Sequence, residues 1–551
     1  MEAIFLNPGT DTPPLQEAWA KLSMAGETVP RLVLCPHEIV AVTAAQGYYL
    51  ASGKPQVAFV HVDVGTANAA GGLNDARASQ IPLLLCAGTS PSVLDSQVPG
   101  ARTKFINWLQ DVPDQPALVR NYTKWASVLN HPEAIGATVE RAFQIAQSEP
   151  CGPVYLAMAR ELMMAEVETT YARGPERTRP SILQGLTDAT ADRVVAALAE
   201  AQFPLLLTGY AGRSREHREA LVKLADTLAI GITEYRGRFN APLEHPLHLG
   251  FNPERWVGQA DVVLVVDQDV PFVPADRELR PDARFIHMGT NPIQTGMTQW
   301  GFPADEVLPV NVKEGLDALL RAAERYLPSL DEKRHGGRRQ EMENRHRQVI
   351  EPFENTPRIA NVITPFMVGQ TLTELCPEAQ LYEEAVTSGN PFAYGFRPSS
   401  EGAYMRNGGS FLGWGLGASI GAALARPDKL VVTVVGDGSF MFGVPSAALW
   451  TAVQNRVAVL ILVVNNACYN SVRLAARDAY PSGTQAASGF VGVDIIDPPA
   501  FEAIAQACGA WGVRVDNPVE LKPRIREALD VVKGGRTAVV NITIQAAEKP
   551  L

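Results

Sequence analysis

The chain has 551 residues, of which 46% are hydrophobic and 19% charged, so it is globular and long enough for about three domains. Its formal net charge of −11 disfavours a nucleic-acid partner, because phosphate binding needs clustered Lys and Arg. Six scattered cysteines without a C-x-x-C pair argue for a reducing compartment and against zinc. The apolar runs are too short to span a bilayer, and residues 1–14 lack a signal peptide's basic start and apolar core, so we expect no membrane partner and a cytoplasmic protein.

The first block of the chain alternates strand and helix patterns. Residues 35–52 read as a loop entering a helix, with Glu38 in the first turn. Residues 59–78 read as a strand, a glycine-rich turn and a helix, and His61 stands where that strand ends. Taken alone, Glu38 is an acid that stabilises a helix N-terminus, and His61 is a hydrogen-bonded structural residue.

A second block follows a polar segment. A short strand at 152–156 closes the first block, and residues 166–180, rich in charge, Gly and Pro, read as a linker. From Thr187 the alternation resumes and predicts a Rossmann-like domain with strands at 204–207, 262–266 and 284–288. This block has no G-x-G-x-x-G, and we find no residues that would hold FAD or ADP. The charge run at 331–347 is typical of a solvated helix or a linker.

The third block contains a strand-helix-strand unit. Residues 408–425 are rich in glycine and small residues and read as a turn and a close-packed helix. Next come a β-branched run that predicts a buried strand, a helix and a further strand, at 430–435, 445–455 and 457–464. The block ends after a strand at 537–544.

Polar residues follow both strands of this unit. Gly436-Asp437-Gly438-Ser439 follows the first strand and Asn465-Asn466 the second. Because the carboxyl ends of neighbouring parallel strands meet at one edge of a sheet, Asp437 and Asn466 are expected to lie close together. A carboxylate and an amide oxygen suit Mg²⁺, with phosphate and water completing its coordination, and the glycines let the backbone approach phosphate oxygens. Alone, each motif is an ordinary turn.

The combination of these motifs resembles the thiamin diphosphate enzymes of the decarboxylase and acetohydroxyacid synthase type. The resemblance implies that Glu38 hydrogen-bonds N1′ of the aminopyrimidine and that Leu412 wedges between the two cofactor rings. It further implies Asp437, Asn466 and Cys468 as ligands of Mg²⁺. The cofactor contacts implied in this way are Glu38, Gly409, Leu412, Gly436, Asp437, Gly438, Ser439, Asn466, Cys468 and Tyr469.

Within that family the local similarity is greatest to the benzoylformate decarboxylases. His61, four residues before Gly65, falls at an active-site histidine of those enzymes, and Thr10 falls at a serine. The resemblance therefore implies Glu38, His61 and Thr10 as catalytic residues, although a Thr after Asn-Pro-Gly is equally a helix cap. No residue corresponds to their second active-site histidine.

The expected architecture is α/β, with three doubly wound parallel-sheet domains: pyrimidine-binding at 1–170, Rossmann-like at 187–327 and diphosphate-binding at 356–551. The resemblance implies a homodimer or homotetramer whose active site lies at the subunit interface. The expected reaction is non-oxidative decarboxylation of a 2-oxo acid, with carboligation to an aldehyde. Three alternatives remain: an acetolactate synthase-like carboligase, a lyase of 2-hydroxyacyl compounds or their CoA thioesters, and a non-catalytic or dinucleotide-binding protein.

The sequence does not identify the substrate. The aromatic residues Phe392, Tyr394, Phe396 and Tyr404 could line a site for a bulky acyl group, or they could simply pack.

Overall fold

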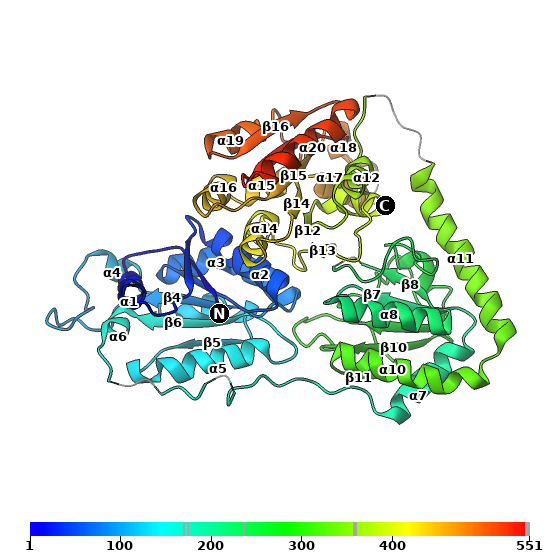
Figure 1. Ribbon diagram of the computed structural model, residues 1–551, viewed down its shortest axis with the longest axis horizontal. Coiled ribbons are helices and arrows are strands. Elements are labelled where there is room, and N and C mark those ends of the chain that lie inside the picture. Colours follow the sequence, from blue (N-terminus) through cyan, green and yellow to red (C-terminus); the bar gives the residue numbers. More distant parts are fainter. Residues whose placement is uncertain (169–170, 175, 236, 356–360, 546–551) are drawn as a thin grey trace. The chain divides into compact units, whose positions relative to one another are not determined.

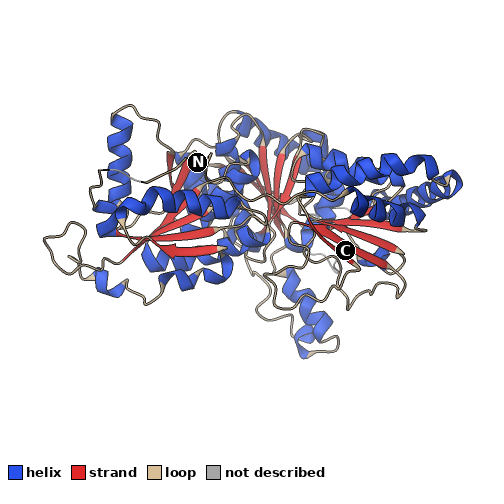
Figure 2. Ribbon diagram, turned by 90° about the horizontal axis from the view of Figure 1, so that it is seen from below, coloured by secondary structure: helices blue, strands red, loops and turns tan. Residues whose placement is uncertain are grey.

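The computed structural model describes residues 1–168, 171–174, 176–235, 237–355 and 361–545. The chain forms two compact units. Among the described residues, unit 1 combines the two ends of the chain (up to 181, 380–386 and 407–545), and unit 2 holds the middle (182–379 and 387–406). The architecture is α/β, with three parallel sheets flanked by helices (Figure 2). The predicted domain boundaries at 170 and 356 fall outside the described residues.

The first sheet of unit 1 has the strand order β2-β1-β3-β4-β6-β5. Helices α2 and α3 lie on one face of it and α5 on the other (Figure 1). Its strands are β1 (Ala3–Leu6), β2 (Arg31–Leu34), β3 (Val57–Val60), β4 (Leu84–Thr89), β5 (Trp125–Val128) and β6 (Val154–Ala159). Its helices are α1 (Pro13–Met24), α2 (Glu38–Ser52), α3 (Val62–Ala78), α4 (Ile106–Leu109), α5 (Ile135–Gln147) and α6 (Arg160–Met164).

The glycine-rich turn predicted within 59–78 is wrong, because α3 begins at Val62 and runs through those glycines. The chain reverses at Val62 itself, whose φ is 35°. The glycines serve close packing instead. A Cβ added at Gly71 would lie 2.1 Å from the ring of Phe411, and one at Gly72 would lie 3.0 Å from Val42.

The second sheet of unit 1 contains, in this order, β12 (Gln380–Glu384), β14 (Val431–Gly436), β15 (Leu460–Asn465), β17 (Ala538–Thr543) and β16 (Trp511–Val515). The strand-helix-strand unit is present, but a short helix that the sequence did not predict, α15, begins at Asp437. The helices are α14 (Trp414–Ala425), α15 (Asp437–Phe442), α16 (Pro445–Gln454), α17 (Asn470–Ala479), α18 (Thr484–Ala487), α19 (Phe501–Ala507) and α20 (Pro518–Lys533).

Helices α2 and α14 join the two halves of unit 1 by packing backbone against backbone. A Cβ at Gly47 would lie 1.8 Å from the carbonyl oxygen of Ala418, and one at Gly421 would lie 1.9 Å from that of Ala44. Only hydrogen fits at these positions, so the small residues of both helices fix how closely their axes approach. The predicted close-packed helix at 408–425 begins at Trp414, after a loop.

Unit 2 contains the third sheet, in the order β11-β10-β9-β7-β8. Its strands are β7 (Pro204–Thr208), β8 (Gly231–Glu234), β9 (Val262–Val266), β10 (Arg284–Gly289) and β11 (Glu306–Pro309), and β13 (Ala403–Arg406) also falls in this unit. Its helices are α7 (Asp188–Glu200), α8 (Arg215–Leu228), α9 (Glu254–Val257), α10 (Val312–Tyr326), α11 (Glu332–Glu354), α12 (Pro365–Leu375) and α13 (Gly389–Gly395). The charge run at 331–347 thus forms most of a helix, α11.

The cores of the units are the strands and the inward faces of their helices. All residues of β6 and β9 are buried, as their continuous apolar sequences require in a sheet covered on both faces. Within the described ranges, no helix combines the length and hydropathy that a membrane span would need.

Replacing Gly421 with Ala should destabilise unit 1 by roughly 1–3 kcal/mol, since the added methyl collides with backbone that cannot rotate away. The measurement is the denaturant midpoint, together with hydrogen exchange in α2 and α14. Gly336→Ala in α11 is the matched control, because the same methyl meets nothing within 4 Å there and should stabilise that helix by about 0.5–1 kcal/mol. Equal effects of the two substitutions would show that the backbones do not meet.

Candidate active site

The residues predicted to bind a metal lie at one sheet edge. Strands β14 and β15 pair in parallel, with Gly436 opposite Val464, so Asp437 and Asn466 both follow the carboxyl ends of neighbouring strands. The side chain of Asp437 is buried, with 3% of the residue exposed. Sequence reasoning placed both residues at this edge, and the structure brings them there.

The carboxylate of Asp437 is only partly satisfied. Its Oδ1 accepts a hydrogen bond of 2.8 Å from the Gly438 N–H, whereas its buried Oδ2 has no partner among the described residues. Burial raises the pKa of Asp437, and the backbone N–H groups of Gly438, Ala467 and Cys468 oppose that shift. These N–H groups also show that the turn after β15 lies beside the carboxylate. A buried oxygen without a partner is the kind of donor that a hard cation would satisfy.

The turn after β15 is held by the side chain of Asn466. The Oδ1 atom accepts hydrogen bonds from the backbone N–H of Cys468 at 3.1 Å and from its thiol at 3.4 Å, and Ala467 has a φ of 54°. Burial raises the pKa of Cys468, which keeps the sulfur a protonated donor. Cys468 would therefore contribute to a magnesium site through its carbonyl oxygen and not through a thiolate.

This donor set fits Mg²⁺ and does not resemble a zinc site. Among the described residues there is no group of three or more His, Cys, Asp or Glu side chains that could hold a metal. One carboxylate with amide and carbonyl oxygens instead leaves positions for phosphate and water, as Mg²⁺ sites commonly do. Gly438 lies directly under the ring of Tyr469, where an added Cβ would be 2.6 Å from Cε1. Ser439 is buried in the first turn of α15.

Glu38 is the first residue of α2. His37 caps this helix, since its Nδ1 accepts a hydrogen bond from the Ile39 N–H at 3.2 Å. The Oε2 atom of Glu38 accepts a hydrogen bond of 3.2 Å from Asn68 Nδ2 in α3, and the residue is 9% exposed. A Cβ at Gly65 would lie 3.4 Å from Glu38 Oε1, so the small residue leaves the carboxyl room beside α3. Glu38 is thus a desolvated acid and not an exposed helix-stabilising charge.

The loop before α14 is shaped by two buried acids. Glu384, at the end of β12, accepts hydrogen bonds from Gly413 N at 2.6 Å and Gly415 N at 2.7 Å, and burial raises its pKa to about 8. Asp75 in α3 would lie 2.1 Å from a Cβ at Gly409, so this loop passes directly over it. Leu412, predicted to support the cofactor rings, is half-buried in the same loop.

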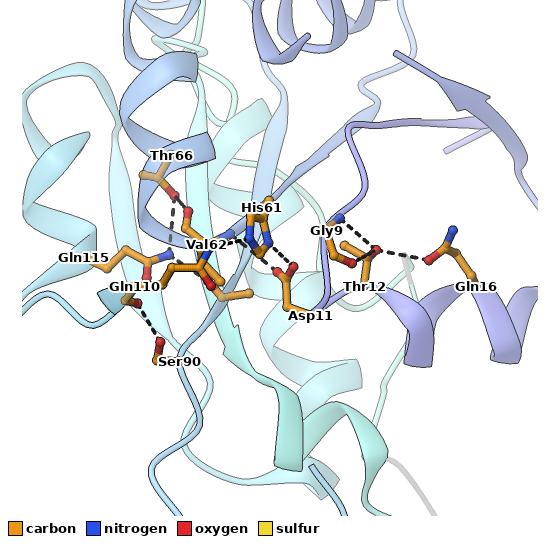
Figure 3. Close-up of polar contacts among 11 residues, drawn as sticks. Gly9, Asp11, Thr12, Gln16, His61, Val62, Thr66, Ser90, Gln110 and Gln115 are labelled. Carbon is orange, nitrogen blue, oxygen red and sulfur yellow. Dashed lines mark hydrogen bonds and ion pairs between the residues drawn. The ribbon is translucent and has the colours of Figure 1, made fainter. Parts of the chain in front are cut away.

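His61 makes polar contacts on both ring nitrogens (Figure 3). Its Nδ1 contacts the carboxylate of Asp11, and its Nε2 lies 2.7 Å from Nε2 of Gln110. Thr10 is exposed, whereas Asp11 beside it is buried with 4% exposed. The Asp11 contact raises the pKa of His61 above its ordinary value, and burial opposes the shift.

Sequence reasoning missed Asp11, Gln110, Asp75 and Glu384. Asp11 stands shortly before Pro13, where it looks like an acid at a helix start. Gln110 lies in a segment without periodicity, so no local signal marks it. The proximity of Asp75 to Glu384 follows only from the packing of α3 near the loop before α14.

The four aromatic residues weighed as possible site-lining residues are all buried. In unit 2 the ring of Tyr394 stacks on Phe353 at a centroid distance of 3.9 Å, and its hydroxyl accepts a hydrogen bond from the Phe251 N–H at 3.0 Å. Phe392 stacks on Phe396. These contacts favour the packing interpretation.

Comparisons with known proteins agree with this arrangement. Three family models of thiamine pyrophosphate enzymes match the chain: the N-terminal TPP binding domain at residues 1–118, the central domain at 191–319 and the C-terminal TPP binding domain at 389–542. Benzoylformate decarboxylase from Pseudomonas aeruginosa is 25% identical over 573 residues, covering 100% of this chain and 97% of that protein. Acetolactate synthase isozyme 3 large subunit from Escherichia coli is also 25% identical, covering 94% of this chain and 88% of that protein.

A solved structure shares the fold. The thiamine diphosphate-dependent 4-hydroxybenzoylformate decarboxylase of Rhodococcus jostii RHA1 superposes with a TM-score of 0.79 at 22% identity, covering 100% of this chain and 97% of that one.

The buried acid Asp75, which lies under the loop before α14, predicts that the stability of the fold depends on pH. Burial raises the pKa of Asp75 to about 8, so the folded state keeps a proton that the unfolded chain releases near the ordinary pKa of 3.8. Between those two values the folded state binds more protons, and the free energy of unfolding therefore falls as the pH rises. Asp75→Asn carries no charge, so its stability relative to the native chain should increase from pH 5 to pH 8 by on the order of a few kcal/mol.

Thermal unfolding of both proteins across this pH range measures the effect. Asp428→Asn is the control, because Asp428 is exposed and its pKa is lowered to about 2 by Arg426, so this substitution should add no slope between pH 5 and pH 8. Parallel pH profiles for the native chain and Asp75→Asn would contradict the prediction.

Proposed function

The chain belongs to the thiamine pyrophosphate enzymes, and on that premise we propose that it is a magnesium-dependent, non-oxidative decarboxylase of 2-oxo acids with carboligase capability. The observation that carries the proposal is the buried, unpartnered Oδ2 of Asp437 beside Asn466 at a strand edge. The same unit also holds a desolvated Glu38. Bound thiamin diphosphate would supply a nucleophilic carbon and accept the electron pair as CO₂ leaves.

Asp437, Asn466 and the Cys468 carbonyl would hold Mg²⁺, which would supply positive charge to offset that of the diphosphate. Asp437 supplies the negative charge that the buried cation needs, and the two neutral oxygens complete the protein's share of ligands. The backbone of Gly436 and Gly438 and the hydroxyl of Ser439 would contact phosphate oxygens.

Glu38 would exchange a proton with the aminopyrimidine of the cofactor. Its carboxyl is desolvated and is held by Asn68, which keeps Oε2 in a fixed position. A carboxyl held at a fixed position can pass a proton to and from a neighbouring ring nitrogen. Gly409, Leu412 and Tyr469 would shape the surrounding pocket.

His61 and Thr10 would act on the substrate. The contact with Asp11 raises the pKa of His61 and so favours the protonated ring, which would donate a proton to the substrate. Thr10 would hydrogen-bond the substrate carboxylate through its exposed hydroxyl. Carboligation would use an aldehyde as the second carbonyl compound.

We propose that the active enzyme is a homodimer or a homotetramer with each site shared between subunits. Unit 1 exposes several large apolar side chains near α4 and α15, which is the composition expected of an association surface. Those around α4 are Phe105 at 78%, Trp108 at 53% and Leu109 at 63% exposed, and those of α15 are Met441 at 41% and Phe442 at 46% exposed.

An acetolactate synthase-like carboligase is the second candidate. The E. coli acetolactate synthase subunit is as similar to this chain as the benzoylformate decarboxylase is. Incubation with pyruvate alone distinguishes the two, because acetolactate accumulates only if a second pyruvate is the acceptor.

The function is tested by measuring CO₂ release from a panel of 2-oxo acids, aromatic and aliphatic, with thiamin diphosphate and Mg²⁺ added. We expect release to require both additions, and Asp437→Asn to need far more Mg²⁺, because the cation loses its charged ligand. Calorimetric titration of thiamin diphosphate at fixed Mg²⁺ checks the same loss without turnover. Asp428→Asn, at an exposed acid paired with Arg426, is the matched control. Absence of cofactor binding by the native chain would refute the proposal.

The shared site predicts complementation between inactive variants. Glu38→Gln should fold and bind Mg²⁺ but turn over at least roughly 100-fold more slowly, since a positioned proton-transfer group is lost. If Glu38 and Asp437 of different subunits form one site, dissociating and reassociating a mixture of Glu38→Gln and Asp437→Asn produces hybrids with one intact site. Activity should then approach about a quarter of the native value, given random pairing into dimers.

Each variant reassociated alone serves as the control. No recovery in mixed samples whose subunit exchange is verified by mass would show that both residues of a site belong to one chain.

A further inference from the structure

Asp11 lies next to His61, at the edge where the carboxyl ends of the first sheet's strands meet. It follows β1, His61 follows β3, and Gly88 lies near the end of β4, and these three strands are neighbours in the order β1-β3-β4. One carboxylate oxygen of Asp11 contacts His61 Nδ1, and the other accepts the Val62 N–H at 3.5 Å (Figure 3). The carboxylate thus joins the loops after two adjacent strands.

Two glycines leave the space that this pair occupies. A Cβ at Gly9 would lie 1.9 Å from His61 Nδ1, and a Cβ at Gly88 would lie 2.0 Å from Asp11 Oδ2. The carboxylate and the ring therefore lie against bare backbone on both sides. Packing as tight as this holds the imidazole in a single orientation.

The contact with Asp11 determines which ring nitrogen carries the proton. A carboxylate only accepts hydrogen bonds, so Nδ1 must donate, and the neutral ring then has its lone pair on Nε2. Gln110 lies 2.7 Å from Nε2 and can present either its amide N–H₂ or its oxygen there. Gln110 can therefore satisfy the ring in both protonation states while no substrate is bound.

The backbone at this point is strained in a way that the contact explains. Val62 has a φ of 35°, a conformation that β-branched residues rarely adopt, and it directly follows His61. The Asp11 carboxylate accepts the N–H of this residue and so helps to hold the reversal. Strained residues of this kind gather at functional sites.

We propose that Asp11 is a positioning residue for the reaction put forward above: it holds His61 with Nδ1–H directed inward, so that Nε2 faces the substrate in place of Gln110. In this role the Nε2–H of the imidazolium passes its proton to the substrate-derived carbon after CO₂ has left, and the neutral ring regains a proton from water. The inference rests on the proposed function, but the pairing itself can be measured in protein without cofactor.

Other charges face the ring. Asp63 of α3 and Glu38 of α2 both raise the pKa of His61 through space, and neither makes a hydrogen bond to the ring. Asp63→Asn is therefore the matched control, since it removes a nearby carboxylate that does not touch the imidazole.

The first experiment is ¹⁵N NMR of histidine-labelled, cofactor-free protein, with the His61 signals assigned from their loss in His61→Gln. We expect the neutral ring to carry its proton on Nδ1, the Asp11→Asn substitution to lower the His61 pKa, and Asp63→Asn to lower it much less. The tautomer in the native protein decides the matter even if Asp11→Asn does not fold. A neutral ring protonated on Nε2, or a His61 pKa that Asp11→Asn leaves unchanged, would overturn the proposal.

The second experiment follows turnover of the best 2-oxo acid against pH. Asp11→Asn should lower kcat roughly 10- to 100-fold at pH 7, and it should move the limb that requires protonated His61 to lower pH. The double variant Asp11→Asn/His61→Gln should be no slower than His61→Gln, because Asp11 acts only through the ring. An additive loss in the double variant would show that Asp11 acts independently of His61.

The two experiments separate the possible failures. If no 2-oxo acid is decarboxylated but NMR shows the Nδ1–H tautomer, the pairing stands, and the reaction assigned to the site is wrong. If decarboxylation occurs and the Asp11→Asn substitution leaves the His61 pKa unchanged, the positioning role is wrong and the proposed function stands.

Discussion

The relative position of the two halves of unit 1 depends on how closely helices α2 and α14 approach each other. Gly47 and Gly421 allow the backbone of each helix to touch that of the other, and this contact joins the two halves of unit 1. Glu38 stands at the start of α2, and the loop bearing Gly409 and Leu412 leads directly into α14. A wider helix spacing would move Glu38 away from that loop. The distance between them within unit 1 is therefore set by residues that have no side chain at all.

Unit 1 contains several buried acids, and their carboxyl groups differ in their hydrogen-bond partners. Glu384 accepts two backbone N–H groups and braces the start of α14, while Asp75 lies under the same loop and favours its protonated form. Asp11 contacts the imidazole of His61, and Glu38 accepts a hydrogen bond from the side-chain amide of Asn68. Asp437 and Asp75 both keep buried carboxylate oxygens that have no hydrogen-bond partner among the described residues. Asp437 lies at the carboxyl end of a central strand, where ligands of α/β sheets bind. Its unpartnered oxygen is therefore better placed than those of Asp75 to bind an external cation.

The sequence predicted the parts of the fold that local patterns encode. The β-branched run before Gly436 and the strand before Asn466 were recognisable because a sheet covered on both faces needs continuous apolar strands. Their parallel pairing placed Asp437 beside the turn of Asn466. The glycines of α3 were misread because glycine usually marks a turn, whereas here Gly71 makes room for Phe411, a residue distant in sequence. Asp11 was missed for a related reason, since its contact with His61 exists only because β1 and β3 are neighbours.

The slot formed by Gly9 and Gly88 has a consequence for how the chain can vary. Side chains at positions 11 and 61 can be exchanged without new collisions if the replacements are no larger. At either glycine, even the smallest substitution inserts a carbon where a ring or a carboxylate already lies. The packing of this slot therefore tolerates replacement of the acid or the imidazole better than replacement of either glycine.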